Sequence, residues 1–139
     1  MDVLMVMDGQ GGGIGRTIIK RMRDAFGDEI EIFALGTNSV ATSQMMKAGA
    51  NRGATGENAI ITTAPQADII IGPLAIIMAN SMMGEVSVGM SKAISSSEAL
   101  KILIPLTQER VRIVGVADEP LPHLIDQAIE IIRGAQGDV

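Results

Sequence analysis

Short apolar runs alternate along the chain with longer stretches in which apolar and polar residues follow a helical spacing. The runs are four to six residues long and consist mainly of Val, Ile, Leu and Met. Such runs are typical of strands that are buried on both faces of a sheet. They predict five strands, at residues 3–7, 30–35, 68–71, 100–104 and 111–116.

The stretches between the runs place their apolar residues on one side of a helix. In the first of them, Ile14, Ile18, Met22 and Phe26 recur at helical spacing, and basic residues lie mainly on the other side. The stretch over residues 73–83 is apolar nearly all round, which predicts that it is buried in the core or in a dimer interface. We expect helices over residues 14–26, 40–48, 55–63, 73–83, 87–94 and 121–133.

Alternating strands and helices predict an α/β fold, a Rossmann-like three-layer sandwich with about five strands, most of them parallel. The last two predicted strands are an exception. About six residues, including Pro105, separate them, and a parallel crossover needs a longer connection. We therefore expect one antiparallel hairpin. The pattern indicates a single nucleotide-binding domain over residues 1–133 and a flexible tail over 134–139.

A glycine-rich segment follows the first predicted strand and precedes the first helix. Residues 8–16 are DGQGGGIGR, with five glycines in seven positions. Glycine lets a ligand approach the backbone closely, and amide groups at a helix start bind phosphate or carboxylate. A tight structural turn would explain some of the glycines, but five exceed what a turn needs. The segment predicts a site for an anionic ligand.

Other polar segments meet this loop if the sheet is parallel. Ligands of such sheets bind at the carboxyl ends of the strands, where the strand order reverses. Residues 36–39 and 72–73 end predicted strands at that edge, and residues 50–58 could fold over it. The predicted binding residues are Asp8, Gly9, Gln10, Gly11, Gly12, Gly13, Ile14, Gly15, Arg16, Thr37, Asn38, Ser39, Arg52, Gly72 and Pro73.

Several of these side chains have a simpler alternative role. The polar side chains of Thr37 and its two successors also suit the start of a helix. Arg52 could hold a phosphate through two hydrogen bonds or pair with Glu57 on the surface. Asp8 could bridge a phosphate through Mg²⁺, or accept hydrogen bonds from the loop. No dedicated metal site is predicted, and His123, the sole histidine, is expected to be a surface or packing residue.

Composition narrows the classes of partner. The net charge is −5, and the chain has no Trp, no Tyr and two Phe, so nucleic acid is not expected as a partner. The absence of cysteine excludes disulfides and thiolate chemistry. No secretory signal is evident, and the longest apolar stretch, at 69–78, contains Gly72 and Pro73 and is too short to span a membrane. We expect a cytoplasmic protein.

The glycine loop resembles the cofactor loop of short-chain dehydrogenases. Gly9-x-x-x-Gly13-Ile14-Gly15-Arg16 matches the G-x-x-x-G-I-G pattern, and the likeness covers about residues 1–38. The resemblance implies NAD(P), another nucleotide or a related phosphorylated ligand. The chain departs from that family in lacking any Tyr for the catalytic Y-x-x-x-K and in having Asp8 where Thr is usual. Its second strand also ends without the acidic residue that holds an NAD ribose.

The whole chain is similar to a family of short, functionally uncharacterised bacterial proteins. The resemblance implies the fold and the location of the site, and no established activity comes with it. The segments that carry the resemblance are DGQGGGIG, ALGTNSVATS, KAGANRGATGENAI, ADIIIGP and KILIPL.

Three functional hypotheses follow. The first is a protein that binds a nucleotide, a dinucleotide or another phosphorylated small molecule, as a sensor or partner subunit without catalytic residues of its own. The second is an enzyme acting on a phosphorylated small molecule, in which Asp8, Arg52, Glu57 or Lys92 supplies charge around one pocket. The third is a homo-oligomeric scaffolding protein that assembles through its Met-rich helices. A homo-oligomer is compatible with the first hypothesis.

Overall fold

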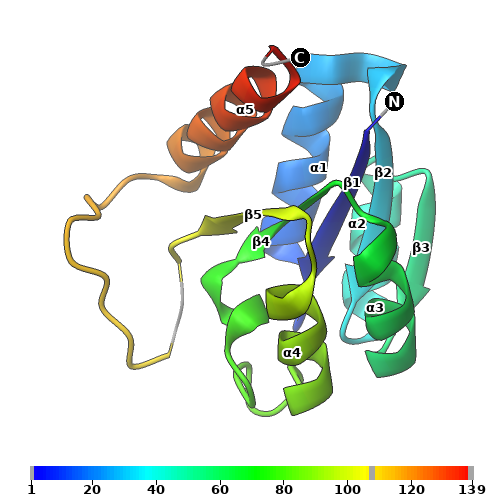
Figure 1. Ribbon diagram of the computed structural model, residues 1–139, viewed down its shortest axis with the longest axis vertical. Helices are drawn as coiled ribbons and strands as arrows, with labels where there is room; N and C mark the ends of the chain where they lie inside the picture. Colours follow the sequence, from blue (N-terminus) through cyan, green and yellow to red (C-terminus); the bar gives the residue numbers. More distant parts are fainter. Residues whose placement is uncertain (1, 107–108, 138–139) are drawn as a thin grey trace.

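The computed structural model describes residues 2–106 and 109–137. Its centre is a sheet of five parallel strands in the order β3-β2-β1-β4-β5 (Figure 1). The three-layer α/β fold predicted from the sequence is confirmed. The strands are β1 (Val3–Asp8), β2 (Glu31–Gly36), β3 (Arg52–Thr55), β4 (Ile69–Pro73) and β5 (Leu100–Ile104).

The strand order places a reversal at the centre of the sheet. From β1 the chain moves outward through β2 to β3, and it then returns to β4 on the other side of β1. Asp8 is in register with Gly36, and Gly36 is in register with Thr55. These strands therefore end at one level, and the crevice between the ends of β1 and β4 is the usual ligand position in such folds.

Helices cover both faces of the sheet. Helices α1, α2 and α5 pack on one face, and α3 and α4 pack on the other. Their bounds are α1 (Gly13–Phe26), α2 (Ser39–Lys47), α3 (Glu57–Thr63), α4 (Val88–Ser96) and α5 (Leu121–Gly137), with 3₁₀ turns at Gly27–Glu29, Ala64–Gln66 and Leu74–Ile77. No helix in the described ranges is both long and apolar enough to cross a bilayer.

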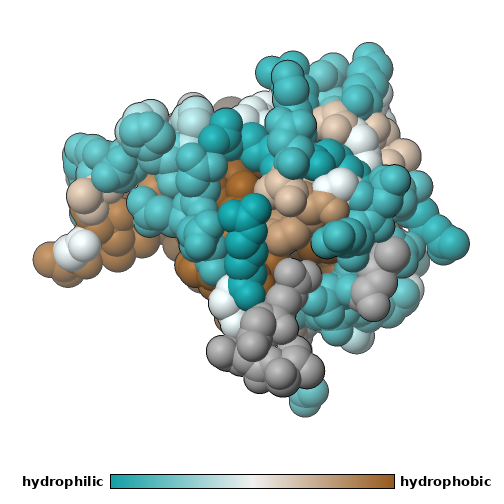
Figure 2. Space-filling model, turned by 90° about the horizontal axis from the view of Figure 1, so that it is seen from above, coloured by the Kyte–Doolittle hydropathy of each residue, from teal (hydrophilic) through white to brown (hydrophobic). Residues whose placement is uncertain are grey.

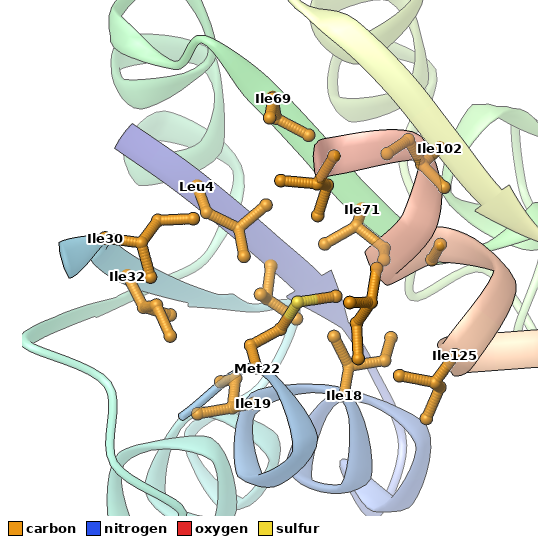
Figure 3. Packing of buried hydrophobic residues seen from close by; sticks show 14 of the residues in the cluster. Leu4, Ile18, Ile19, Met22, Ile30, Ile32, Ile69, Ile71, Ile102 and Ile125 are labelled. Atoms are coloured by element: carbon orange, nitrogen blue, oxygen red, sulfur yellow. The ribbon is translucent and has the colours of Figure 1, made fainter. Parts of the chain in front are cut away.

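Strand β1 shows why the strands are continuous apolar runs. Leu4 and Val6 point to the layer of α1 and α5, whereas Met5 and Met7 point to the layer of α3 and α4. All four side chains are fully buried. Figure 3 shows the first of these layers, with Leu4 among the isoleucines of the sheet and of α1 and α5. Burial on both sides leaves no polar face to alternate with an apolar one.

The predicted antiparallel hairpin is wrong. Strand β5 pairs in parallel with β4, because α4 supplies the crossover between them. Residues 109–120 form no strand and project from the molecule as an irregular arm, drawn in orange in Figure 1. The sequence also did not reveal β3, whose residues Arg-Gly-Ala-Thr contain no apolar run and pair only with β2.

The predicted helix over residues 73–83 is also wrong. Pro73 ends β4, a short 3₁₀ turn follows, and residues 78–87 form a loop. Ile76 is fully buried as expected, but Met83 is 98% exposed. The other predicted helices are present. Helix α5 extends four residues beyond its expected end at Arg133.

Candidate functional site

A pocket of about 390 Å³ lies at the carboxyl end of the sheet, beside the central reversal. The glycine loop forms one wall. Pro73 at the end of β4 and Ala75 just after it form part of another. Polar backbone and apolar side chains therefore face the same space, as in many small-molecule sites. The lining residues are Asp8, Gly9, Gln10, Gly11, Gly12, Gly13, Ile14, Pro73, Ala75, Met82, Leu106 and Glu109.

Asp8 holds the glycine loop in place. Its side chain is nearly fully buried. Oδ1 accepts a hydrogen bond of 2.8 Å from the N–H of Gly9, and Oδ2 accepts one of 2.7 Å from the N–H of Gly15. Burial raises the pKa of Asp8, while hydrogen bonds from the loop backbone oppose that rise and the charge of Glu85 adds to it. The carboxylate thus has an internal structural role at the start of α1.

Three glycines of the loop are required by packing. Gly9, Gly12 and Gly15 are buried. A Cβ on Gly12 would lie 2.8 Å from Cα of Ala41, and one on Gly15 would lie 2.5 Å from Sδ of Met45. Gly12 also has a φ of 74°, which favours glycine. Gly12 and Gly15 let α1 and the loop approach α2 closely, and a Cβ on Gly9 would lie 2.6 Å from both Sδ of Met82 and Oγ1 of Thr37.

The other two glycines have no such packing reason. Gly11 and Gly13 are exposed, and a Cβ on either would meet nothing within 4 Å. Both line the pocket. Because only glycine leaves the backbone wholly uncovered, these two positions are where a ligand could reach the main chain.

The loop amides divide in the same way. Gly9 and Gly15 donate to Asp8, the N–H of Gln10 donates to Glu85, and the N–H of Gly12 donates to the carbonyl of Gly9. Across residues 2–106 and 109–137, the N–H groups of Gly11 and Gly13 have no hydrogen-bond partner. Most amides of the glycine loop are therefore already hydrogen-bonded within the protein. The amides available to a ligand are those of Gly11 and Gly13.

Glu85, which the sequence did not indicate, is bound to the glycine loop beside the pocket. It lies in the loop over residues 78–87, and its Oε1 accepts hydrogen bonds from the N–H of Gln10 at 2.8 Å, Oγ1 of Thr37 at 2.7 Å and Nδ2 of Asn38 at 2.9 Å. The hydrogen bond from Gln10 contributes most to lowering the pKa of Glu85, and those from Thr37 and Asn38 add to it. No local motif marks it, because its partners lie 47 to 75 residues away.

Asn38 caps helix α2, as expected, and it also links the glycine loop to Glu85. Its Oδ1 accepts a hydrogen bond from the N–H of Ala41 and so caps α2. Its Nδ2 donates to the carbonyl of Gln10 as well as to Glu85. The ends of β1 and β2 are therefore joined through one amide side chain.

The remaining predicted residues do not all gather at the pocket. Pro73 and Ile14 line it. Gly72 is buried in β4, where a Cβ would meet the carbonyl oxygen of Met7. Ser39 is exposed at the start of α2, and Arg16 is exposed on α1, with Nη1 3.5 Å from Oε1 of Gln44.

The charged residues of the enzyme hypothesis are separated in space. Arg52 is exposed at the first residue of the edge strand β3, at the opposite end of that strand from Thr55. Glu57 and Lys92 are exposed on α3 and α4. Of the four residues named in that hypothesis, only Asp8 lines the pocket.

The hydrogen bonds of Asp8 favour its role as an acceptor for the loop over a bridge to phosphate through Mg²⁺. Both oxygens of Asp8 accept hydrogen bonds from the backbone. The described part of the chain contains no cluster of three or more His, Cys, Asp or Glu that could hold a metal ion. His123 is exposed on α5 beside Glu119, with Nδ1 3.2 Å from Oε2.

A family model matches residues 3–136 and is described as a domain of unknown function, DUF3842. The chain belongs to the DUF3842 family. The predicted membership of a family of uncharacterised proteins is confirmed. No curated protein is detectably similar in sequence to this DUF3842 protein.

Two solved structures are similar to the DUF3842 protein at low sequence identity. A dodecameric FMN-dependent UbiX-like decarboxylase from Escherichia coli O157:H7 is 13% identical with a TM-score of 0.48, over 95% of this chain and 94% of that one. A universal stress protein in complex with cAMP is 15% identical with a TM-score of 0.43, over 75% of this chain and 98% of that one. These values are too low for either ligand to inform the site described above.

Proposed function

We propose that this protein binds a nucleotide, a dinucleotide or another small phosphorylated molecule in the pocket beside the glycine loop. The observation that carries the proposal is the pair Gly11 and Gly13. Both are exposed in the pocket wall, neither is needed for packing, and their N–H groups have no partner among the described residues.

The surroundings of these amides suit a phosphate group. Gly13 begins α1, a helix of 14 residues, so the positive end of the helix dipole faces the same space. Amide N–H groups and a helix start together favour an anion. Ile14, Pro73, Ala75 and Leu106 supply apolar surface in the same pocket, on which a base or another ring of the ligand can pack.

The arrangement favours binding over catalysis by the chain itself. The enzyme hypothesis requires Asp8, Arg52, Glu57 and Lys92 around one pocket, and three of the four lie elsewhere. Asp8 is engaged in holding the loop. A sensor or a partner subunit that responds to the ligand is the function that this site supports best.

A comparison of alanine variants tests the proposal. Thermal unfolding is measured with NAD, NADP, ADP, ATP, coenzyme A and FMN for the natural chain and for Gly11→Ala and Gly13→Ala. A compound at a hundredfold excess over its Kd stabilises the folded chain by about 2.7 kcal/mol. Each variant places a methyl group in the pocket without a clash in the free protein, so the stabilisation by ligand should be lost while the fold remains.

Gly134→Ala is the matched control. Gly134 lies on α5 away from the pocket, and a Cβ there also meets nothing within 4 Å. The control should respond to the ligand as the natural chain does. Absence of stabilisation of the natural chain by every phosphorylated compound would contradict the proposal, as would equal stabilisation of the Gly11 and Gly13 variants.

A further inference from the structure

The Glu85 carboxylate occupies a set of donors that is built for an anionic oxygen. The N–H of Gln10, Oγ1 of Thr37 and Nδ2 of Asn38 all donate to the same atom, Oε1 of Glu85, at 2.7 to 2.9 Å. Hydrogen bonds to a charged acceptor are about twice as strong as neutral ones. Three of them on one oxygen describe an anion site that is filled by the protein's own side chain.

The donors of this site are fixed without help from Glu85. Thr37 and Asn38 follow β2 directly, and Asn38 also caps α2. The N–H of Thr37 donates to the carbonyl of Asp8, and the carbonyl of Gln10 accepts from Nδ2 of Asn38. The donor set therefore belongs to the sheet edge and would persist if Glu85 left it.

The segment that carries Glu85 is strained. In residues 78–87, Asn80, Met82 and Met83 have φ values of 67°, 54° and 56°, a region that costs energy for residues other than glycine. Met83 is 98% exposed. Apart from Glu85, the N–H of Met82 is held by Oε1 of Glu109 at 2.8 Å. Ser81 and Val86 are buried, and Oγ of Ser81 donates to the carbonyl of Ala75, so the two carboxylates fasten the strained tip between them, residues 82–85, against the pocket.

The donor set and the open amides are contiguous. Gln10 donates to Glu85, and Gly11, which follows it, has an N–H without a partner in the described chain. Met82, three residues before Glu85, lines the pocket together with Gly11. Thr37, Asn38 and Glu85 are not among the lining residues of the pocket, but Gln10 belongs to both sets, so an anionic group beside Gly11 lies next to the position that Glu85 occupies.

We propose that Glu85 is an internal competitor: a phosphate group of the ligand displaces its carboxylate from Gln10, Thr37 and Asn38, and the tip of the loop, residues 82–85, moves away from the site. This inference rests on the proposed function. Its consequence is that the loop reports ligand occupancy, which is what a sensor or partner subunit requires.

The test is to remove the competitor and measure binding. ADP and, separately, inorganic phosphate are titrated into Glu85→Ala, Glu85→Gln and the natural chain, with amide signals followed by NMR. If Glu85 fills the donors in roughly nine of ten free molecules, Glu85→Ala should bind ADP about tenfold more tightly than the natural chain. Binding should move the signals of Gln10, Thr37 and Asn38. Tighter binding of ADP alone identifies a nucleotide phosphate, and tighter binding of both probes identifies the phosphate group itself.

Glu98→Ala is the matched control, because it removes one exposed negative charge near the start of β5, at the other edge of the sheet. It should bind as the natural chain does. Glu85→Gln, which keeps the size of the side chain and loses its charge, should fall between the natural chain and Glu85→Ala, and it decides the question if the alanine variant does not fold.

The outcomes separate the two proposals. If ADP binds the natural chain and moves the Gly11 and Gly13 signals, but neither Glu85 variant binds more tightly than Glu98→Ala, the competitor role is wrong and the proposed function stands. If neither ADP nor phosphate binds any of these chains, and the wider panel of compounds also fails, the proposed function and this inference fall together.

Discussion

The first and last strand-to-helix connections begin at the same edge of the sheet and lead to helices on the same face, yet they are built differently. Between β1 and α1 the chain needs only four residues, and Asp8 fastens them from within. Between β5 and α5 it takes sixteen, and residues 110–118 are exposed throughout. The first connection is fastened from within by a buried carboxylate, whereas in the second Glu109 accepts a hydrogen bond from the N–H of Met82 and the exposed residues 110–118 follow it.

Replacing Asp8 breaks the first connection and has the largest expected effect. Asp8→Ala leaves the buried N–H groups of Gly9 and Gly15 without their acceptor. An orphaned buried donor costs about 1–3 kcal/mol, so the free energy of unfolding should fall by roughly 2–4 kcal/mol, measured by chemical denaturation. Asp118→Ala, an exposed carboxylate on the second connection, is the control. Similar losses for the two variants would contradict the internal role of Asp8.

Two neighbouring glycines sharpen the same comparison. Gly12→Ala places a Cβ 2.8 Å from Cα of Ala41, at a residue with positive φ, and should lower the free energy of unfolding by about 1–3 kcal/mol. Gly13→Ala meets nothing within 4 Å and should be neutral or stabilise by up to about 1 kcal/mol. Equal destabilisation by both substitutions would contradict the assignment of Gly12 to packing and of Gly13 to an open position in the pocket wall.

The sequence was informative where a residue is recognised from its immediate neighbours. Strand β1 and helix α1 were predictable because their apolar residues are buried in a regular pattern, and the glycine loop was placed correctly between them. Strand β3 was not, because an exposed edge strand needs no apolar run. The run at 111–116 was wrongly predicted to be a strand, because its apolar residues are exposed and none of them joins the buried core.

The candidate site was predictable only in part for the same reason. The positions of Asp8 and the loop follow from the order of strand, glycines and helix. The role of Glu85 depends on a loop that returns from the far side of β4 to Gln10, 75 residues earlier. Neither the local sequence pattern nor the composition predicts that contact. The division of the glycines also depends on α2, through Ala41 and Met45.

The pH dependence of stability separates Glu85 from its uncharged variant. The folded pKa of Glu85 is lowered from 4.5, so its carboxylate stabilises the folded chain above that pH, and the contribution is lost as pH falls through the folded pKa. The advantage of the natural chain over Glu85→Gln in free energy of unfolding should be largest near neutral pH and should shrink below about pH 4.5. Denaturation curves at a series of pH values measure it. An advantage that is constant with pH would contradict the assigned hydrogen bonds.

The smallest expected effect is on the second connection, and it bears on the predicted homo-oligomer. Val111, Ile113, Val114 and Val116 are all exposed, Val114 at 99%, and Figure 2 shows apolar surface on the projecting arm. Exposed apolar patches often mark protein interfaces. If the protein is a monomer, Val114→Asp should change its free energy of unfolding by less than about 0.5 kcal/mol, because the side chain is on the surface. If copies associate through the arm, the same substitution should lower the molar mass measured by light scattering and make stability less dependent on protein concentration. An unchanged mass with unchanged stability would leave Val114 in solvent and would assign any assembly to another surface.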